Sequence, residues 1–198
     1  NDIECYGCNR DPNPALHGNL TQWSKVVTRF TDVVPWIPYA GPNSPAAGGW
    51  SDLDSLELGN GDKDGITPDE RQSMFVLWSI SCAPLFLGSD LTHMDPADLI
   101  LLSNPDIIAI DQRGIPARPL DIQHLRNKPQ QAWLTTYPNG SAILALFNLA
   151  DTPSEITLSW REIDALRNTH FTARIASSHP PTLEDLIAHT TPPADPAG

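Results

Sequence analysis

The apolar positions in the first part of the chain follow a helical period. Between residues 18 and 31 they recur at spacings of three and four, at Leu20, Trp23, Val26, Val27 and Phe30. This period predicts an amphipathic helix that is capped by Asn19 or Thr21 and ended by Pro35 and Pro38.

Three later segments carry the signals of helix starts. In Thr67-Pro68-Asp69-Glu70, a threonine can cap, a proline occupies the first helical position, and a glutamate completes a capping box. The following residues, through Ile80, are apolar almost all round, which predicts a buried helix. Asp95-Pro96 and Asn104-Pro105 predict two further helices.

Short apolar runs predict strands between and after these helices. Residues 50–58 and 84–88 alternate with the predicted helices, and we expect an α/β layer architecture up to about residue 115. Residues 131–137, 141–147 and 155–160 are separated by turns and predict an antiparallel β module. The sequence after Arg174 has no periodicity, and we expect residues 176–198 to be a mostly disordered tail.

Charge and length restrict the classes of partner. The 198 residues carry a formal net charge of -12, and the 12 Lys and Arg are scattered rather than gathered into a stripe. A nucleic-acid partner is therefore disfavoured, whereas a neutral ligand such as a sugar is compatible with this charge. No apolar run approaches the roughly 20 residues of a membrane-spanning helix, so no membrane partner is expected.

Three cysteines bear on redox chemistry and location. Cys5-x-x-Cys8 has neither a second cysteine pair nor a nearby set of histidine ligands, so a disulfide, local or to another segment, is favoured over zinc. Cys82 leaves the set odd in number. Asn19 and Asn139 begin glycosylation sequons, and together these features favour a secreted or extracellular origin.

The densest cluster of chemistry is Gly48-Gly49-Trp50-Ser51-Asp52-Leu53-Asp54. If this segment is extended, Asp52 and Asp54 point to the same side, as suits proton transfer, metal binding or sugar hydroxyls; a solvated turn is the alternative. The loop that follows resembles the start of an EF-hand, but Arg71 stands where the bidentate glutamate is required.

Other catalytic signatures are missing from the sequence. The six histidines have no ligand spacing, and no nucleophile elbow or phosphate loop occurs, so neither a metal nor a cofactor is expected. The remaining candidate is chemistry by carboxyl groups. Four aspartates lie near predicted strand ends, where parallel barrels carry their catalytic residues: Asp2, Asp52, Asp54 and Asp90.

An ordered series of motifs resembles the α-galactosidases of glycoside hydrolase family 27. It runs through Ala40-Gly41-Pro42, residues 48–54, 58–61, 67–70 and 77–80, then Ala83-Pro84-Leu85, residues 89–91 and 102–112. The resemblance implies the last strands and helices of a (β/α)8 TIM barrel at residues 1–116. A small antiparallel all-β domain, incomplete at its end, would follow at residues 117–175.

The resemblance also implies roles for individual residues. Family members are retaining glycosidases, whose two catalytic carboxyl groups lie about 5 Å apart. Asn1-Asp2-Ile3 matches the end of the family's acid/base motif, which makes Asp2 the candidate acid/base. Asp54 matches an aspartate beside the galactose subsite, so Trp50, Asp54 and Ser55 are candidate substrate-binding residues and Asp52 a structural one.

The sequence departs from the family pattern in two places. The family motif Trp-Asn-Asp-Pro-Asp-Met has become Trp50-Ser51-Asp52-Leu53-Asp54-Ser55. The family nucleophile lies in a Lys-x-Asp strand, and no such motif occurs in the 198 residues, so the nucleophile is absent from this chain.

These observations leave two hypotheses open. The first is an α-galactosidase-like hydrolase acting on oligosaccharides or galactosides, with N-acetylgalactosamine and β-L-arabinopyranose as alternative sugars. The second is a catalytically silent remnant that binds carbohydrate. We expect an open barrel edge either to receive a barrel segment that carries the nucleophile or to drive self-association.

Overall fold

The computed structural model describes residues 20–42, 44 and 48–163. Its α-helices are α1 (Trp23–Asp32), α2 (Pro68–Ile80), α3 (Pro96–Leu102) and α4 (Pro105–Gln112), and its strands are β1 (Arg118–Pro119), β2 (Gln130–Thr136) and β3 (Ala142–Asn148). Short 3-10 helices cover Val34–Tyr39, Gly61–Asp64 and Gln123–Leu125. Within this described part, no helix is long and apolar enough to cross a bilayer.

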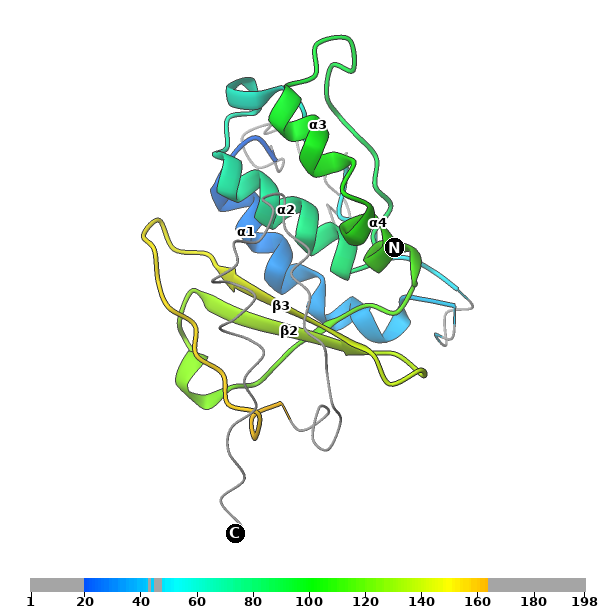
Figure 1. The fold of residues 1–198 in the computed structure, drawn as a ribbon, viewed down its shortest axis with the longest axis vertical. Helices are drawn as coiled ribbons and strands as arrows, with labels where there is room; N and C mark the ends of the chain where they lie inside the picture. Colours follow the sequence, from blue (N-terminus) through cyan, green and yellow to red (C-terminus); the bar gives the residue numbers. More distant parts are fainter. Residues whose placement is uncertain (1–19, 43, 45–47, 164–198) are drawn as a thin grey trace, which may run out of the picture.

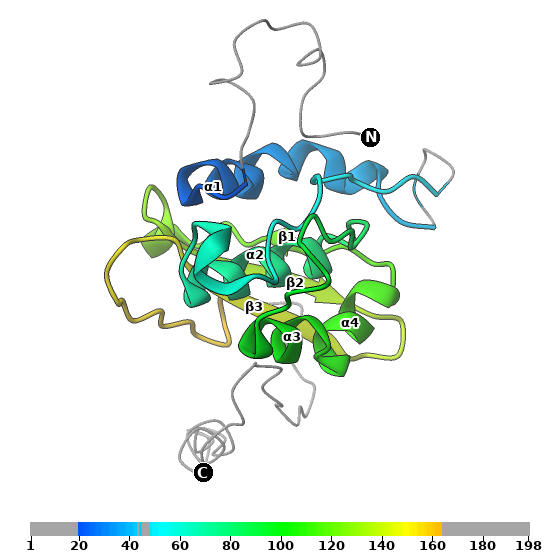
Figure 2. The same cartoon turned by 90° about the horizontal axis from the view of Figure 1, so that it is seen from above.

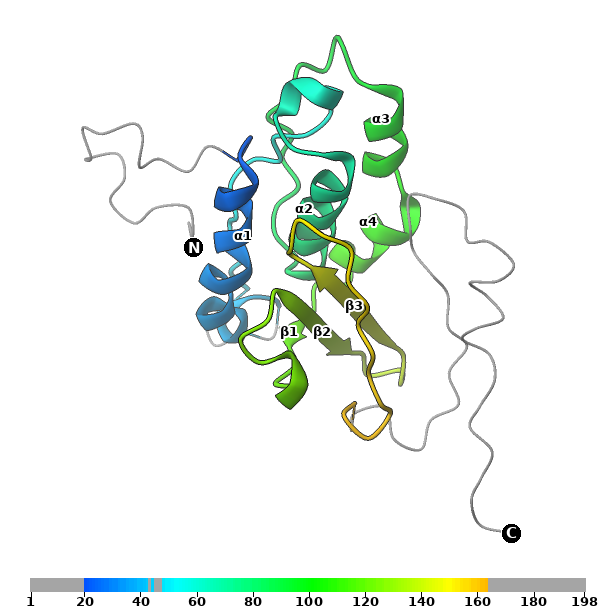
Figure 3. The same cartoon turned by 90° about the vertical axis from the view of Figure 1, so that its left-hand side faces the viewer.

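The helices form a layer with α2 at its centre. In Figures 1 and 3, α1 lies on one side of α2, and α3 and α4 lie on the other. Figure 2 shows the same order from above. The central position of α2 explains its all-round apolar pattern, because α1, α3, α4 and β3 all contact it.

The predicted helix starts are confirmed for α2, α3 and α4. At α2, the Thr67 hydroxyl accepts from the Glu70 N–H and the Glu70 carboxylate accepts from the Thr67 N–H, which completes the capping box. Asp95 and Asn104 cap α3 and α4 through their side chains. The predicted cap of α1 is wrong, because Gln22 holds that position without a side-chain hydrogen bond.

The sheet is antiparallel and has the order β1-β2-β3. β2 pairs with β3 without a bulge, from Gln130 opposite Asn148 to Thr136 opposite Ala142. Phe30 of α1 packs edge-on against Trp133 of β2 and Phe147 of β3, with ring centroids 6.3 and 4.8 Å apart. One buried apolar cluster therefore joins the helical layer to the sheet.

Three predicted strands do not form as regular strands. Residues 50–58 contain only isolated bridge residues, at Asp52 and Leu56, and Leu56 forms a parallel bridge with Leu87. Residues 84–88, an apolar run that we predicted to form a buried strand, contribute only the bridge at Leu87, and Phe86 is 64% exposed. Residues 155–160 form no strand, because hydrogen bonds in this region run to side chains such as His124, which contacts the Thr157 carbonyl.

The described residues thus combine a helical layer with a three-stranded antiparallel sheet. The mixed α and β content agrees with the predicted class. The bridge between Leu56 and Leu87 is parallel, which is the direction that strands have in a (β/α)8 barrel.

Candidate functional site

The acidic motif forms a tight turn rather than an extended strand. Asp52 Oδ1 accepts a hydrogen bond of 2.9 Å from the Asp54 N–H, which closes an Asx turn. Asp54 itself has a φ of 79°, in the left-handed region. The prediction that strand alternation aligns the two carboxylates is therefore wrong, and Asp52 instead shapes the backbone that presents Asp54.

Asp54 is held by hydrogen bonds to its side chain and to its backbone carbonyl. Its carboxylate Oδ1 accepts from the Ser55 N–H at 2.6 Å and from the Ser55 hydroxyl at 3.2 Å. Its carbonyl accepts from the indole N–H of Trp78 at 2.8 Å, and Trp78 is fully buried in α2. The turn is thus hydrogen-bonded to α2 through the Asp54 carbonyl, while Ser55 holds the half-buried side chain of Asp54.

Glu57 is an acidic neighbour that the sequence interpretation missed. Burial raises the pKa of its carboxyl, and the charges of Asp54 and Asp64 raise it too, whereas a hydrogen bond from Ser55 lowers it. A side chain at Gly88 would collide with the Glu57 carboxylate, so the two segments approach closely here.

Trp50 is partly exposed and rests on the segment after α4. A Cβ at Gly114 would lie 3.0 Å from its indole ring, and Gly114 has a φ of 69°. Glycine is therefore favoured at this position both because a Cβ would crowd the Trp50 ring and because the backbone is in the left-handed region. A cavity of about 230 Å³ lies beside this contact and is lined by residues including Gly41, Pro42 and Gly114.

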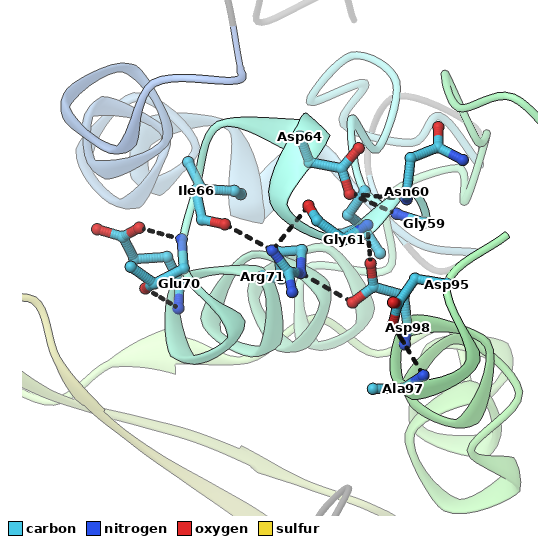
Figure 4. A network of polar contacts seen from close by, with 12 residues as sticks. Gly59, Asn60, Gly61, Asp64, Ile66, Glu70, Arg71, Asp95, Ala97 and Asp98 are labelled. Carbon is cyan, nitrogen blue, oxygen red and sulfur yellow. Dashed lines mark hydrogen bonds and ion pairs between the residues drawn. The ribbon is translucent and has the colours of Figure 1, made fainter. Parts of the chain in front are cut away.

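The loop after Asp54 is anchored by a buried polar network, which Figure 4 shows from close by. Asp64 Oδ2 accepts from the N–H groups of Gly59 and Asn60 at 2.8 and 2.9 Å. Arg71 Nε donates to Asp98 Oδ1 at 2.8 Å, and both side chains are 4% exposed. Arg71, which ruled out the EF-hand pattern, thus serves as the loop's anchor.

The same network closes around the backbone of the loop. The Gly61 N–H donates to Asp98 Oδ2, and the Arg71 guanidinium donates to the carbonyls of Gly61 and Ile66 at 3.0 and 2.6 Å. The carboxylates of Asp64 in this loop and of Asp98 in α3 are therefore used for internal hydrogen bonds. In the described ranges, no group of three or more His, Cys, Asp or Glu side chains is placed to hold a metal.

Asp90 belongs to a separate exposed loop. Its carboxylate accepts from the Thr92 N–H and hydroxyl and pairs with His93 at 2.8 Å. These hydrogen bonds, that from Thr92 first, lower the pKa of Asp90. Asn60 joins this loop to the acidic segment through the carbonyls of Asp90 and His93. Asp90 therefore stabilises its own turn.

Several predicted residues lie elsewhere. Asp2, Cys5 and Cys8 lie outside the described residues, so the acid/base and disulfide predictions stay predictions. Cys82 is a buried free thiol, and burial raises its pKa to about 12. Asp111 of α4 is a further titratable group missed by the sequence interpretation, because burial raises its pKa to about 6.

Comparisons with known proteins bear on this geometry. A family model described as alpha galactosidase A matches residues 21–113, which include the acidic turn, its Trp78 anchor and the Arg71 network. Residues 21–113 of the chain belong to this α-galactosidase family. The match ends at α4, and the sheet β1-β2-β3 lies beyond it.

Individual relatives agree with this assignment. Alpha-galactosidase 3 of Arabidopsis thaliana is 35% identical over 139 residues, covering 70% of this chain and 30% of the relative. An alpha-galactosidase of Oryza sativa is 30% identical over 157 residues, covering 79% of this chain and 35% of the relative. The chain thus spans about a third of the length of these curated relatives.

Solved structures show the same partial correspondence. A putative alpha-galactosidase/melibiase from Bacteroides fragilis is 30% identical, with a TM-score of 0.59 over 69% of this chain and 30% of that one. The alpha-galactosidase of Saccharomyces cerevisiae, solved with raffinose, is 28% identical, with a TM-score of 0.52 over 62% of this chain and 27% of that one.

Proposed function

We propose that this chain contributes the galactose-binding side of an α-galactosidase-like retaining glycoside hydrolase. The substrate would be a terminal α-D-galactosyl residue of an oligosaccharide or a galactoside. The observation that carries the proposal is the fixed Asp54, whose carbonyl is bound by the buried Trp78 indole within the segment matched by the family. The yeast relative solved with raffinose supports a sugar substrate of this class.

The proposed roles follow from the geometry and the motif match. Asp54 would accept hydrogen bonds from sugar hydroxyls through Oδ2, while Oδ1 is engaged by Ser55. Ser55 would sit in the pocket wall, and the exposed ring of Trp50 would supply an apolar surface next to the sugar. Asp52 would shape the turn, and Asp2 would be the acid/base of a double-displacement reaction.

We further propose that residues 1–116 correspond to the last strands and helices of a (β/α)8 barrel. The parallel bridge between Leu56 and Leu87 supports this, because strands in such barrels are parallel. Residues 117–175 would form the following antiparallel domain, which the pairing of β1, β2 and β3 supports. A secreted parent protein is compatible with the exposed sequon residue Asn139 in the β2–β3 turn.

A second candidate function is carbohydrate binding without turnover. The favouring observation is that the 198 residues contain no Lys-x-Asp motif to supply the nucleophile. Without a nucleophile, a retaining reaction cannot form its glycosyl-enzyme intermediate.

Assays on aryl α-galactosides separate the two candidates. The purified chain would be tested alone and together with a co-expressed barrel segment that carries a Lys-x-Asp strand. The hydrolase proposal predicts turnover in the combined sample, with loss in Asp2→Ala and Asp54→Asn variants and no loss in Asp90→Asn. Galactose binding without turnover in either sample would favour the silent module.

A further inference from the structure

The outer edge of β3 presents backbone groups that have no partner among residues 20–42, 44 and 48–163. The Tyr137 N–H donates to the Ser141 carbonyl, and the Leu149 N–H donates to the Pro129 carbonyl. These two bonds show that odd-numbered residues of β3 point their backbone groups at β2. By the alternation of an antiparallel ladder, the N–H and C=O groups of Ala142, Leu144 and Leu146 point away from β2. No described segment donates to or accepts from them.

The side chains along this edge are apolar and accessible. Leu144 is 38% exposed and Leu146 is 47% exposed, on the sheet face opposite Phe147, which packs into the core. Residues 141–150 contain no charged side chain and no proline, and the pairing of β3 with β2 has no bulge. Soluble proteins usually protect an edge strand by one of these devices, so an edge without them is suited to pairing.

The edge is also complementary to itself. When two copies are placed antiparallel about a two-fold axis at Ala145, Leu144 lies opposite Leu146 of the second copy. Both residues direct backbone groups outward, so the register satisfies the N–H and C=O groups of both strands. Each chain carries a net charge of -12, but β3 itself has no charged side chain. No like charges therefore lie opposite one another in this ladder.

We propose that β3 is a homodimer interface, through which two copies of this chain join their sheets into one continuous antiparallel sheet. The opposite edge of the sheet is β1, which has only two residues and ends in Pro119. Proline cannot donate to a ladder, so this short edge is poorly suited to pairing with a further strand. The assembly therefore closes at two copies rather than extending into a fibre.

A charge-pairing experiment tests both the interface and its register. The mass of the purified chain would be measured by sedimentation in reducing buffer, and twice the 21.6 kDa of one chain is expected. The Leu144→Lys/Leu146→Lys variant places lysine opposite lysine across the axis and should weaken dimerisation about tenfold or more. The Leu144→Lys/Leu146→Glu variant places lysine opposite glutamate and should dimerise close to the original level.

A matched control is available on α3, where Leu99 and Ile100 are 52% and 62% exposed. The Leu99→Lys/Ile100→Lys variant should leave the dimer unchanged. A monomeric original chain, or equal loss in both β3 variants, would overturn the proposal. If a variant fails to fold, amide exchange in the unmodified chain decides: exchange at Leu144 and Leu146 should slow as protein concentration rises, and concentration-independent exchange would contradict the interface.

Discussion

The buried pair of Arg71 and Asp98 gives the sharpest stability prediction. An Arg71→Met substitution keeps the apolar stem but removes the donor to Asp98 and the donors to the carbonyls of Gly61 and Ile66. The Asp98 carboxylate, 4% exposed, would then lie in the interior with only the Gly61 N–H as partner. Removing one member of a buried ion pair typically costs about 3–5 kcal/mol, a large share of the total stability of a domain.

Urea unfolding followed by tryptophan fluorescence measures this loss as a fall in the free energy of unfolding. The matched control is Arg126→Met. Arg126 also pairs with an aspartate, through two contacts of 2.6 Å to Asp121, but both side chains are exposed. Exposed pairs contribute little, so no clear change is expected in the control.

A double variant separates the charge from the hydrogen bonds. Replacing both partners, in Arg71→Met/Asp98→Leu, removes the uncompensated charge and should recover part of the loss. Recovery should be incomplete because the Gly61 N–H stays unpaired, which costs roughly 1–3 kcal/mol. If the free energy of unfolding of Arg71→Met is within about 1 kcal/mol of that of the original chain, the loop is not anchored as described.

Three further predictions concern α4, Cys82 and α2. The pKa of Asp111 is about 6 in the native state, above its ordinary 3.8, so the free energy of unfolding should fall as pH rises from about 4 through 6. The Asp111→Asn variant should show a flatter decline in urea titrations at these pH values. An unchanged slope would contradict the assignment. The thiol of Cys82 is buried and has a pKa of about 12, so it should not react with iodoacetamide at pH 8 until urea is added. Peptide mass spectrometry measures the labelling. Rapid labelling of Cys82 in the folded protein would count against its burial. Thr67→Ala should lower the free energy of unfolding by about 1 kcal/mol in urea titrations, because the capping box is lost.

Local signals in the sequence predicted much of the helical layer. The capping residues Thr67, Asp95 and Asn104 act on their own backbones, so a short window of sequence contains the whole interaction. The same holds for the β2–β3 hairpin, whose turn lies between adjacent segments.

The acidic turn could not be predicted in the same way. The choice between strand and turn at residues 50–58 depends on the left-handed Asp54 and its bond to Trp78, 24 positions later. The role of Arg71 depends likewise on Asp98, which approaches only after α3 packs beside α2. Glu57 was missed because its raised pKa comes mainly from burial, which a sequence window does not contain.

The central claim is that the acidic turn around Asp54 binds galactose. Its most direct test is a titration of the isotope-labelled chain with D-galactose, followed by amide and indole chemical shifts, with D-glucose as the epimeric control. The account predicts saturable shifts at Asp54, Ser55 and Trp50 with galactose, their loss in Asp54→Asn, and much weaker shifts with glucose. Shifts that are absent at these residues, or equal for both sugars, would contradict it.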